Sequence, residues 1–236
     1  MNPSPDRVLS ARWVFPVSGP PLPNGTVTVR DGKIAAIQPR GGRSPDEDLG
    51  NVALIPGLVN AHTHLDLSGA RGLIPPTDPD HFTDWLRGVI AYRRTRTPEE
   101  VQADIRAGLA ECLRFGTTLI GDIAAEGASW DVLEEAQTRA VVFFEMIGLS
   151  KERAEVTRND AGKWYQAHPR TETCRLAFSP HSAYSARRSL LSCATLEEWP
   201  LSIHLAESPG ELELIDSRTG PFVPFLQGLG VWDESG

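Results

Sequence analysis

The sequence predicts an α/β protein built on a parallel sheet and preceded by a smaller β-rich segment. After residue 57, short apolar strand-like runs alternate with amphipathic helical patterns. Before it, alternating apolar residues and turn signals fill residues 7–39. We therefore expect two domains, 1–56 and 57–236. A chain of 236 residues is long enough for one large domain or two modest ones with a buried core.

The β-rich segment contains a strong hairpin signal. Asp31-Gly32 separates the runs "TVTV" and "KIAAI", and glycine accepts the positive φ that a tight two-residue turn needs. We therefore predict a β-hairpin centred on this pair.

The larger segment contains five strand-like runs, near 58–62, 116–123, 140–149, 174–179 and 201–205. The clearest helix begins at Thr97, where Pro98 and Glu100 complete a capping-box pattern. Other helical patterns cover 129–140, 150–168 and 185–198. Five such strands fit either an open doubly wound sheet or the first part of an eight-stranded barrel. The glycine-rich phosphate-binding motifs of open nucleotide-binding sheets are not found.

Composition excludes several classes of function. The chain is 40% hydrophobic with a formal charge of −8, which argues against a nucleic-acid partner. It shows no signal-peptide pattern and no stretch long enough to span a bilayer, so we expect no membrane partner and a cytoplasmic location. Cys112, Cys174 and Cys193 are widely spaced and indicate neither a disulfide framework nor a thiolate zinc site.

Histidines gather at the predicted ends of strands. His62 and His64 are two residues apart, so in a strand they project from the same face, as two nitrogen ligands of one metal would. A lone pair of this kind also fits two histidines that are merely packed or exposed. His181 ends a further strand and His204 lies near the end of the next one. Glu207 follows His204 by three residues, and a carboxylate beside a metal-activated water is a good proton shuttle.

Four sequence stretches together resemble the motifs of the amidohydrolase superfamily: "PGLVNAHTHL", "FGTTLIGDIA", "SPHSAYS" and "HLAES". The resemblance implies a metal-dependent (β/α)8 TIM barrel preceded by a small β-sandwich. The strand "CRLAFSPH" lacks the lysine that bridges two metals in part of the superfamily. The pattern is therefore similar to the one-metal branch of cytosine, guanine and adenosyl-type deaminases and triazine chlorohydrolases.

This resemblance also implies roles for particular residues. His62, His64 and His204 would bind one divalent metal, with zinc favoured over iron. Glu207 would relay a proton to the leaving nitrogen, and His181 would bind or polarise the substrate. We expect hydrolysis of a C–N bond, such as deamination, in a small cyclic amidine or nucleobase-like molecule.

Two aspartates have weaker claims to a role. Asp84 falls where related deaminases place an acidic residue that contacts substrate, although an aspartate at a helix N-terminus is the simpler interpretation. Asp122, at the end of the second strand, is a candidate to support a metal ligand through a hydrogen bond. A purely structural cap fits Asp122 equally well.

The chain departs from the superfamily pattern after Glu207. It contains no later histidine, and its later aspartates come too early to follow an eighth strand. We therefore expect the N-terminal part of the fold: about five βα units of the barrel and part of the sandwich. The alternative is a truncated, non-catalytic binding or scaffold protein. An unpaired sheet edge would also make a homo-oligomer possible.

Overall fold

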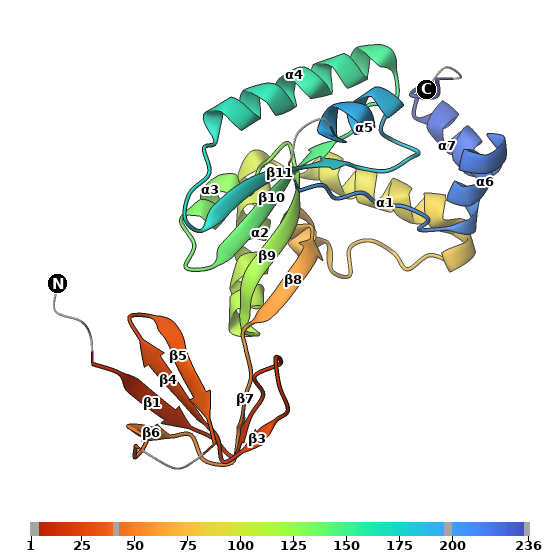
Figure 1. Ribbon diagram of the computed structural model, residues 1–236. Coiled ribbons are helices and arrows are strands. Elements are labelled where there is room, and N and C mark those ends of the chain that lie inside the picture. Colours follow the sequence, from red (N-terminus) through yellow and green to blue (C-terminus); the bar gives the residue numbers. More distant parts are fainter. Residues whose placement is uncertain (1–4, 40–42, 196–199, 234–236) are drawn as a thin grey trace. The chain divides into compact units, whose positions relative to one another are not determined.

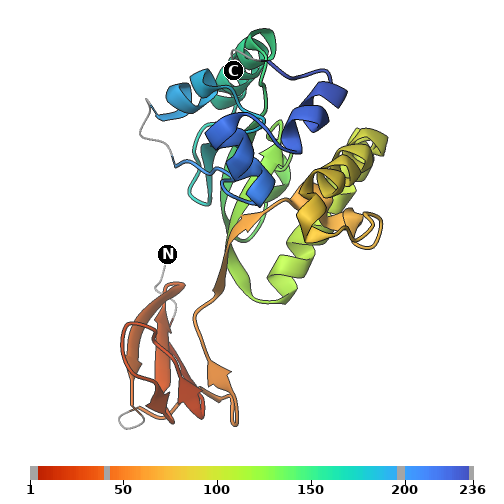
Figure 2. The same cartoon turned by 90° about the vertical axis from the view of Figure 1, so that its right-hand side faces the viewer.

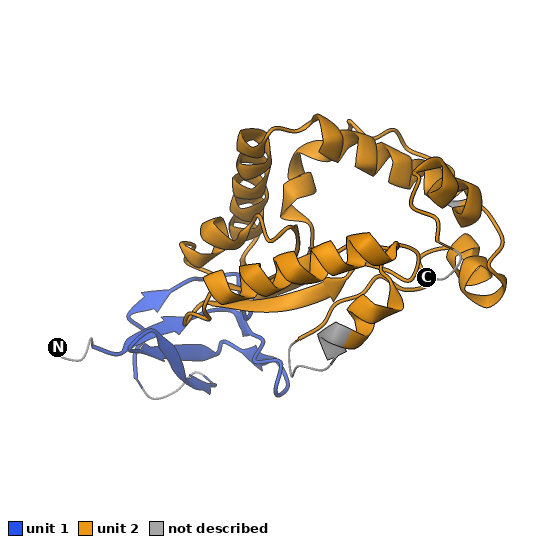
Figure 3. Ribbon diagram, turned by 90° about the horizontal axis from the view of Figure 1, so that it is seen from above, with its two compact units in different colours: residues 1–57 blue, residues 58–236 orange. Residues whose placement is uncertain are grey.

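The computed structural model describes residues 5–39, 43–195 and 200–233. The chain forms two compact units, residues 1–57 and 58–236 (Figure 3). No helix in these described ranges is long and apolar enough to cross a membrane.

The first unit contains two small sheets (Figure 1). One has the order β5-β4-β1-β6, with bounds Lys33–Gln38, Thr26–Arg30, Arg7–Ser10 and Glu47–Asp48. The other has the order β3-β2-β7, with bounds Leu22–Pro23, Trp13–Val14 and Ala53–Leu54. The predicted hairpin is confirmed, because β4 and β5 pair antiparallel around Asp31 and Gly32, whose φ angles are +48° and +71°.

The second unit is built on a parallel four-stranded sheet with the order β11-β10-β9-β8 (Figure 1). The strands in that order are Cys174–Pro180, Arg139–Met146, Thr117–Ala125 and Leu58–Thr63. The chain is thus α/β, as predicted. β8 forms one edge, and Leu58 and Val59 on it are exposed.

The expected strand at 201–205 is wrong in detail. This segment lies beside β11, but it makes only single bridges, from Leu201 to Phe178 and from His204 to Ser182. Phe178 donates to Pro200 and accepts from Ser202. The next donor in a parallel ladder would be residue 180, which is a proline and has no N–H. The ladder is therefore interrupted at this point.

The helices of the second unit lie between its strands or, for the last three in the chain, after β11. They are α1 (Phe82–Thr95), α2 (Pro98–Arg114), α3 (Trp130–Glu134), α4 (Lys151–Ala167), α5 (Arg188–Thr195), α6 (Pro209–Ser217) and α7 (Phe222–Gly228), with 3-10 turns η1 (Leu65–Ala70) and η2 (Pro79–His81). The capping box of α2 forms as predicted: Thr97 accepts from the Glu100 N–H, and Glu100 accepts from the Thr97 N–H. The pattern at 129–140 yields only the short α3.

Two apolar clusters hold this unit together. The larger one joins the sheet to α2, α3 and α4, with Ile105, Ile120, Leu133 and Val142 at 0% exposure. The smaller one joins α1 to α6 and α7 through Leu86, Leu214 and Phe222. Figures 1 and 2 trace the backbones of these three helices. The second cluster fixes α1 in position for the site described below.

Candidate metal centre

The first two predicted ligands lie at the C-terminal end of β8. His62 lies in the strand and is exposed, whereas His64 follows the strand and precedes η1. Their rings are 5.3 Å apart between centroids. The strand therefore presents both imidazoles at its C-terminal end, as the spacing predicts.

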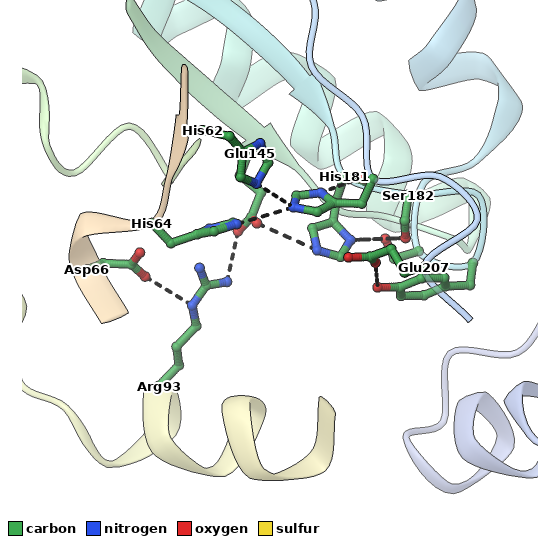
Figure 4. A network of polar contacts seen from close by, with 11 residues as sticks. His62, His64, Asp66, Arg93, Glu145, His181, Ser182 and Glu207 are labelled. Atoms are coloured by element: carbon green, nitrogen blue, oxygen red, sulfur yellow. Dashed lines mark hydrogen bonds and ion pairs between the residues drawn. The ribbon is translucent and has the colours of Figure 1, made fainter. Parts of the chain in front are cut away.

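The segment after β11 brings His204 to the same place. His204 Nε2 lies 3.2 Å from His64 Nε2 and 3.1 Å from His62 Nε2. Figure 4 labels the His62 and His64 side chains. Each residue of this trio offers a ligand atom within 4.8 Å of the others. Two nitrogens bound at roughly 2.0–2.1 Å to a tetrahedral zinc are about 3.3 Å apart. The two distances from His204 Nε2 match this spacing, and the trio forms a group that could hold one metal ion.

The protonation of these rings also suits a cation. Burial lowers the pKa of His64 to about 4, and the partial desolvation of the His62 ring, together with the nearby His204, lowers the pKa of His62. Both imidazoles are therefore neutral near pH 7, and a neutral imidazole has the lone pair that a metal ligand needs.

His181 lies directly after β11 and is mostly buried. Its Nδ1 atom is 2.7 Å from Ser185 Oγ and 3.0 Å from Ser182 Oγ. Its ring lies 4.8 Å from the His204 ring between centroids. The structure thus places His181 beside the histidine trio but outside the group of three possible ligands.

Glu207 is exposed in the loop that precedes α6. Its Oε2 atom accepts a hydrogen bond of 3.1 Å from the Tyr184 hydroxyl. Its backbone N–H donates to Glu211, 2.8 Å away. One carboxylate oxygen of Glu207 is thus held in place by a buried tyrosine.

The two aspartates with weaker claims lie in different surroundings. Asp84 is exposed in the first turn of α1, and its nearest ion-pair partner is Arg87 at 3.9 Å. This position fits the helix N-terminus interpretation, and its contact with substrate stays a prediction. Asp122 is 1% exposed and accepts a 2.8 Å hydrogen bond from the Leu65 N–H, next to His64. Burial raises its pKa to about 7.

Sequence reasoning missed three charged residues at this site. Arg93 of α1 lies 3.0 Å from Asp66 and 2.9 Å from Glu145 (Figure 4). Glu145, at the end of β10, is the only charged residue in the run "AVVFFEM". A charge in an otherwise apolar strand was the signal that could have identified it.

The second unit is thus a parallel α/β unit with three histidines brought together at the ends of its strands, a group that could hold a metal ion. The chain belongs to the amidohydrolase family, whose model matches residues 53–230. The resemblance seen in the sequence is therefore confirmed.

Individual relatives agree with this assignment. The chain is 31% identical over 229 residues to a 5-methylthioadenosine/S-adenosylhomocysteine deaminase from Nitratidesulfovibrio vulgaris, covering 88% of this chain and 50% of the relative. It resembles the fold of the Helicobacter pylori aminofutalosine deaminase in complex with methylthio-coformycin (TM-score 0.79, 23% identity, 94% of this chain, 56% of the other). It also resembles a zinc-bound adenosine deaminase from Xanthomonas campestris (TM-score 0.75, 22% identity, 96% and 55%). The chain thus spans about half the length of each of these relatives.

Proposed function

We propose that the protein is a metal-dependent hydrolase that removes the amino group from a small adenine-nucleoside-type molecule. The observation that carries this proposal is the convergence of the His62, His64 and His204 nitrogens within 4.8 Å. The relatives support the substrate class, since they are named as deaminases of methylthioadenosine, adenosine and aminofutalosine.

In this proposal the three histidines hold one divalent cation, with zinc favoured over iron. Such a cation supplies Lewis-acid activation of water. Glu207 accepts a proton and returns it to the leaving nitrogen. Tyr184 binds Glu207 Oε2, which leaves the other carboxylate oxygen for the proton. His181 binds the substrate, Asp122 supports the loop that follows His64, and Asp84 is a further candidate contact.

We also propose how the two units of this chain belong to the architecture of the whole enzyme. Residues 57–236 would form the first part of a (β/α)8 barrel, and residues 1–56 part of the accompanying sandwich. Because the chain spans about half the length of its relatives, the assay should use the polypeptide as its source cell makes it.

The test measures ammonia release from adenosine and 5′-methylthioadenosine, with zinc removed and then restored. We expect zinc-dependent release and a loss of about 100-fold or more in kcat for Glu207→Gln, because proton transfer contributes at least that much. Glu155→Gln, an exposed change on α4, is the matched control. A zinc-loaded protein that releases no ammonia from either nucleoside would overturn the proposal in favour of a non-catalytic binding or scaffold role.

A further inference from the structure

Three charged side chains form a continuous row beside the histidines. Asp66 in η1, Arg93 in α1 and Glu145 at the end of β10 come from separate elements (Figure 4). Arg93 contacts Asp66 through Nε at 3.0 Å and Glu145 through Nη1 at 2.9 Å. The Asp66 and Glu145 side chains are only 5% and 2% exposed. Buried carboxylates require such partners, because an unpaired buried charge is costly.

One oxygen of this row points toward the candidate site. Arg93 donates a hydrogen bond to Glu145 Oε2. The other oxygen, Glu145 Oε1, is buried and has no hydrogen-bond partner among the described residues. The His181 Nε2 atom lies 3.8 Å from this oxygen. A carboxylate can only accept a hydrogen, so an N–H at His181 Nε2 is the electrostatic complement of this oxygen.

The other ring nitrogen of His181, Nδ1, faces two serine hydroxyls. Nδ1 lies within hydrogen-bond distance of the Ser182 and Ser185 hydroxyls, and a hydroxyl can either donate or accept. In a neutral imidazole only one of the two ring nitrogens carries a hydrogen. The tautomer with hydrogen on Nε2 satisfies both sides, since a serine hydroxyl can then donate to Nδ1.

We propose that Glu145, held by Arg93 and Asp66, is a positioning residue that fixes His181 as the tautomer protonated on Nε2. At 3.8 Å the carboxylate orients the N–H without forming a full hydrogen bond. The N–H therefore stays available to donate to an acceptor atom of the substrate, such as a purine ring nitrogen. Only this donation to the substrate rests on the proposed function; the tautomer of His181 does not.

The test is an imidazole ¹H–¹⁵N correlation spectrum of the ¹⁵N-labelled, metal-free chain, with His181 assigned by comparison with His181→Gln. In the wild type we expect the His181 Nε2 resonance in the range of protonated nitrogens. Glu145→Leu removes the acceptor and should shift it toward the unprotonated range, because the serine hydroxyls can then accept from Nδ1. Glu145→Gln should keep the wild-type pattern, since its amide oxygen can accept. Glu155→Gln is the exposed control and should change nothing.

A wild-type His181 protonated on Nδ1 would overturn the proposal, and so would a folded Glu145→Leu variant whose His181 stays on Nε2. The wild-type spectrum decides by itself if Glu145→Leu does not fold. The spectrum needs neither metal nor substrate, so a failure of the deaminase assay would leave its result intact.

Discussion

The Nδ1 atom of His204 lies 3.0 Å from the backbone carbonyl oxygen of His181. A carbonyl only accepts, so Nδ1 carries the hydrogen and Nε2 keeps its lone pair. Nε2 is also the atom that faces His62 and His64. The backbone of one candidate site residue thus selects the tautomer that another needs to bind a metal.

Zinc binding by the metal-free chain should depend on this trio. His204→Ala removes one of three nitrogens and should weaken zinc binding by more than about 100-fold, because even changes to residues that only support a ligand cost 10–100-fold. Titration calorimetry measures the affinity. His81→Ala is the matched control, since His81 is exposed and lies outside the group. Equal zinc affinities for the two variants would contradict the assignment.

Asp122 should make stability depend on pH. Burial raises its pKa to about 7, above the value of roughly 3.9 in an unfolded chain. The folded state therefore binds this proton more tightly. Its contribution to stability is full below the unfolded pKa and is lost as pH rises through about 7.

Asp122→Asn imitates the protonated acid and keeps an oxygen for the Leu65 N–H. Relative to the wild type, its free energy of unfolding in urea should rise between pH 5 and pH 8 by on the order of 2 kcal/mol. The exposed Asp131→Asn should follow the wild-type curve. Parallel curves for Asp122→Asn and the wild type would show that Asp122 does not titrate in this range.

Local sequence signals predicted those parts of the site that depend on one strand or one helix end. The spacing of His62 and His64 placed both rings at one strand end, and the pattern at Thr97 gave its capping box. The weak pairing of 201–205 depends on Pro180 in a neighbouring strand. It could be found only once the register between the two segments was known.

The row of charges beyond the histidines depends on tertiary packing. Arg93 reaches Glu145 because Leu86 of the same helix packs against α6 and α7, more than 100 residues away in the chain. A helical pattern alone does not specify that contact. In the sequence, Asp66 and Arg93 therefore look like ordinary solvated charges. In the structure they form an ion pair whose side chains are 5% and 26% exposed.

Two glycines near Trp164 should respond in opposite directions to alanine. Gly127 has a φ of +73°, and a Cβ there would lie 2.1 Å from Trp164 Nε1. Gly127→Ala should lower the free energy of unfolding by about 1–3 kcal/mol. Gly162 lies within α4 with nothing within 4 Å of its Cβ position, so Gly162→Ala should raise it by about 0.5–1 kcal/mol. Urea unfolding followed by tryptophan fluorescence measures both, and equal effects would contradict the packing described here.

Tyr184→Phe should separate proton transfer from metal binding. Tyr184 is 3% exposed, and burial raises its pKa, so the hydroxyl stays protonated and donates to Glu207. Phenylalanine keeps the ring packing against Phe222, whose centroid lies 4.6 Å away. We expect unchanged zinc affinity and a fall in deamination kcat of about tenfold, the size typical for the loss of a residue that orients a functional group.

Tyr165→Phe on α4 is the control. A Tyr184→Phe enzyme with wild-type kcat would show that Glu207 needs no support from Tyr184, and a parallel loss of zinc would place Tyr184 in the metal site itself.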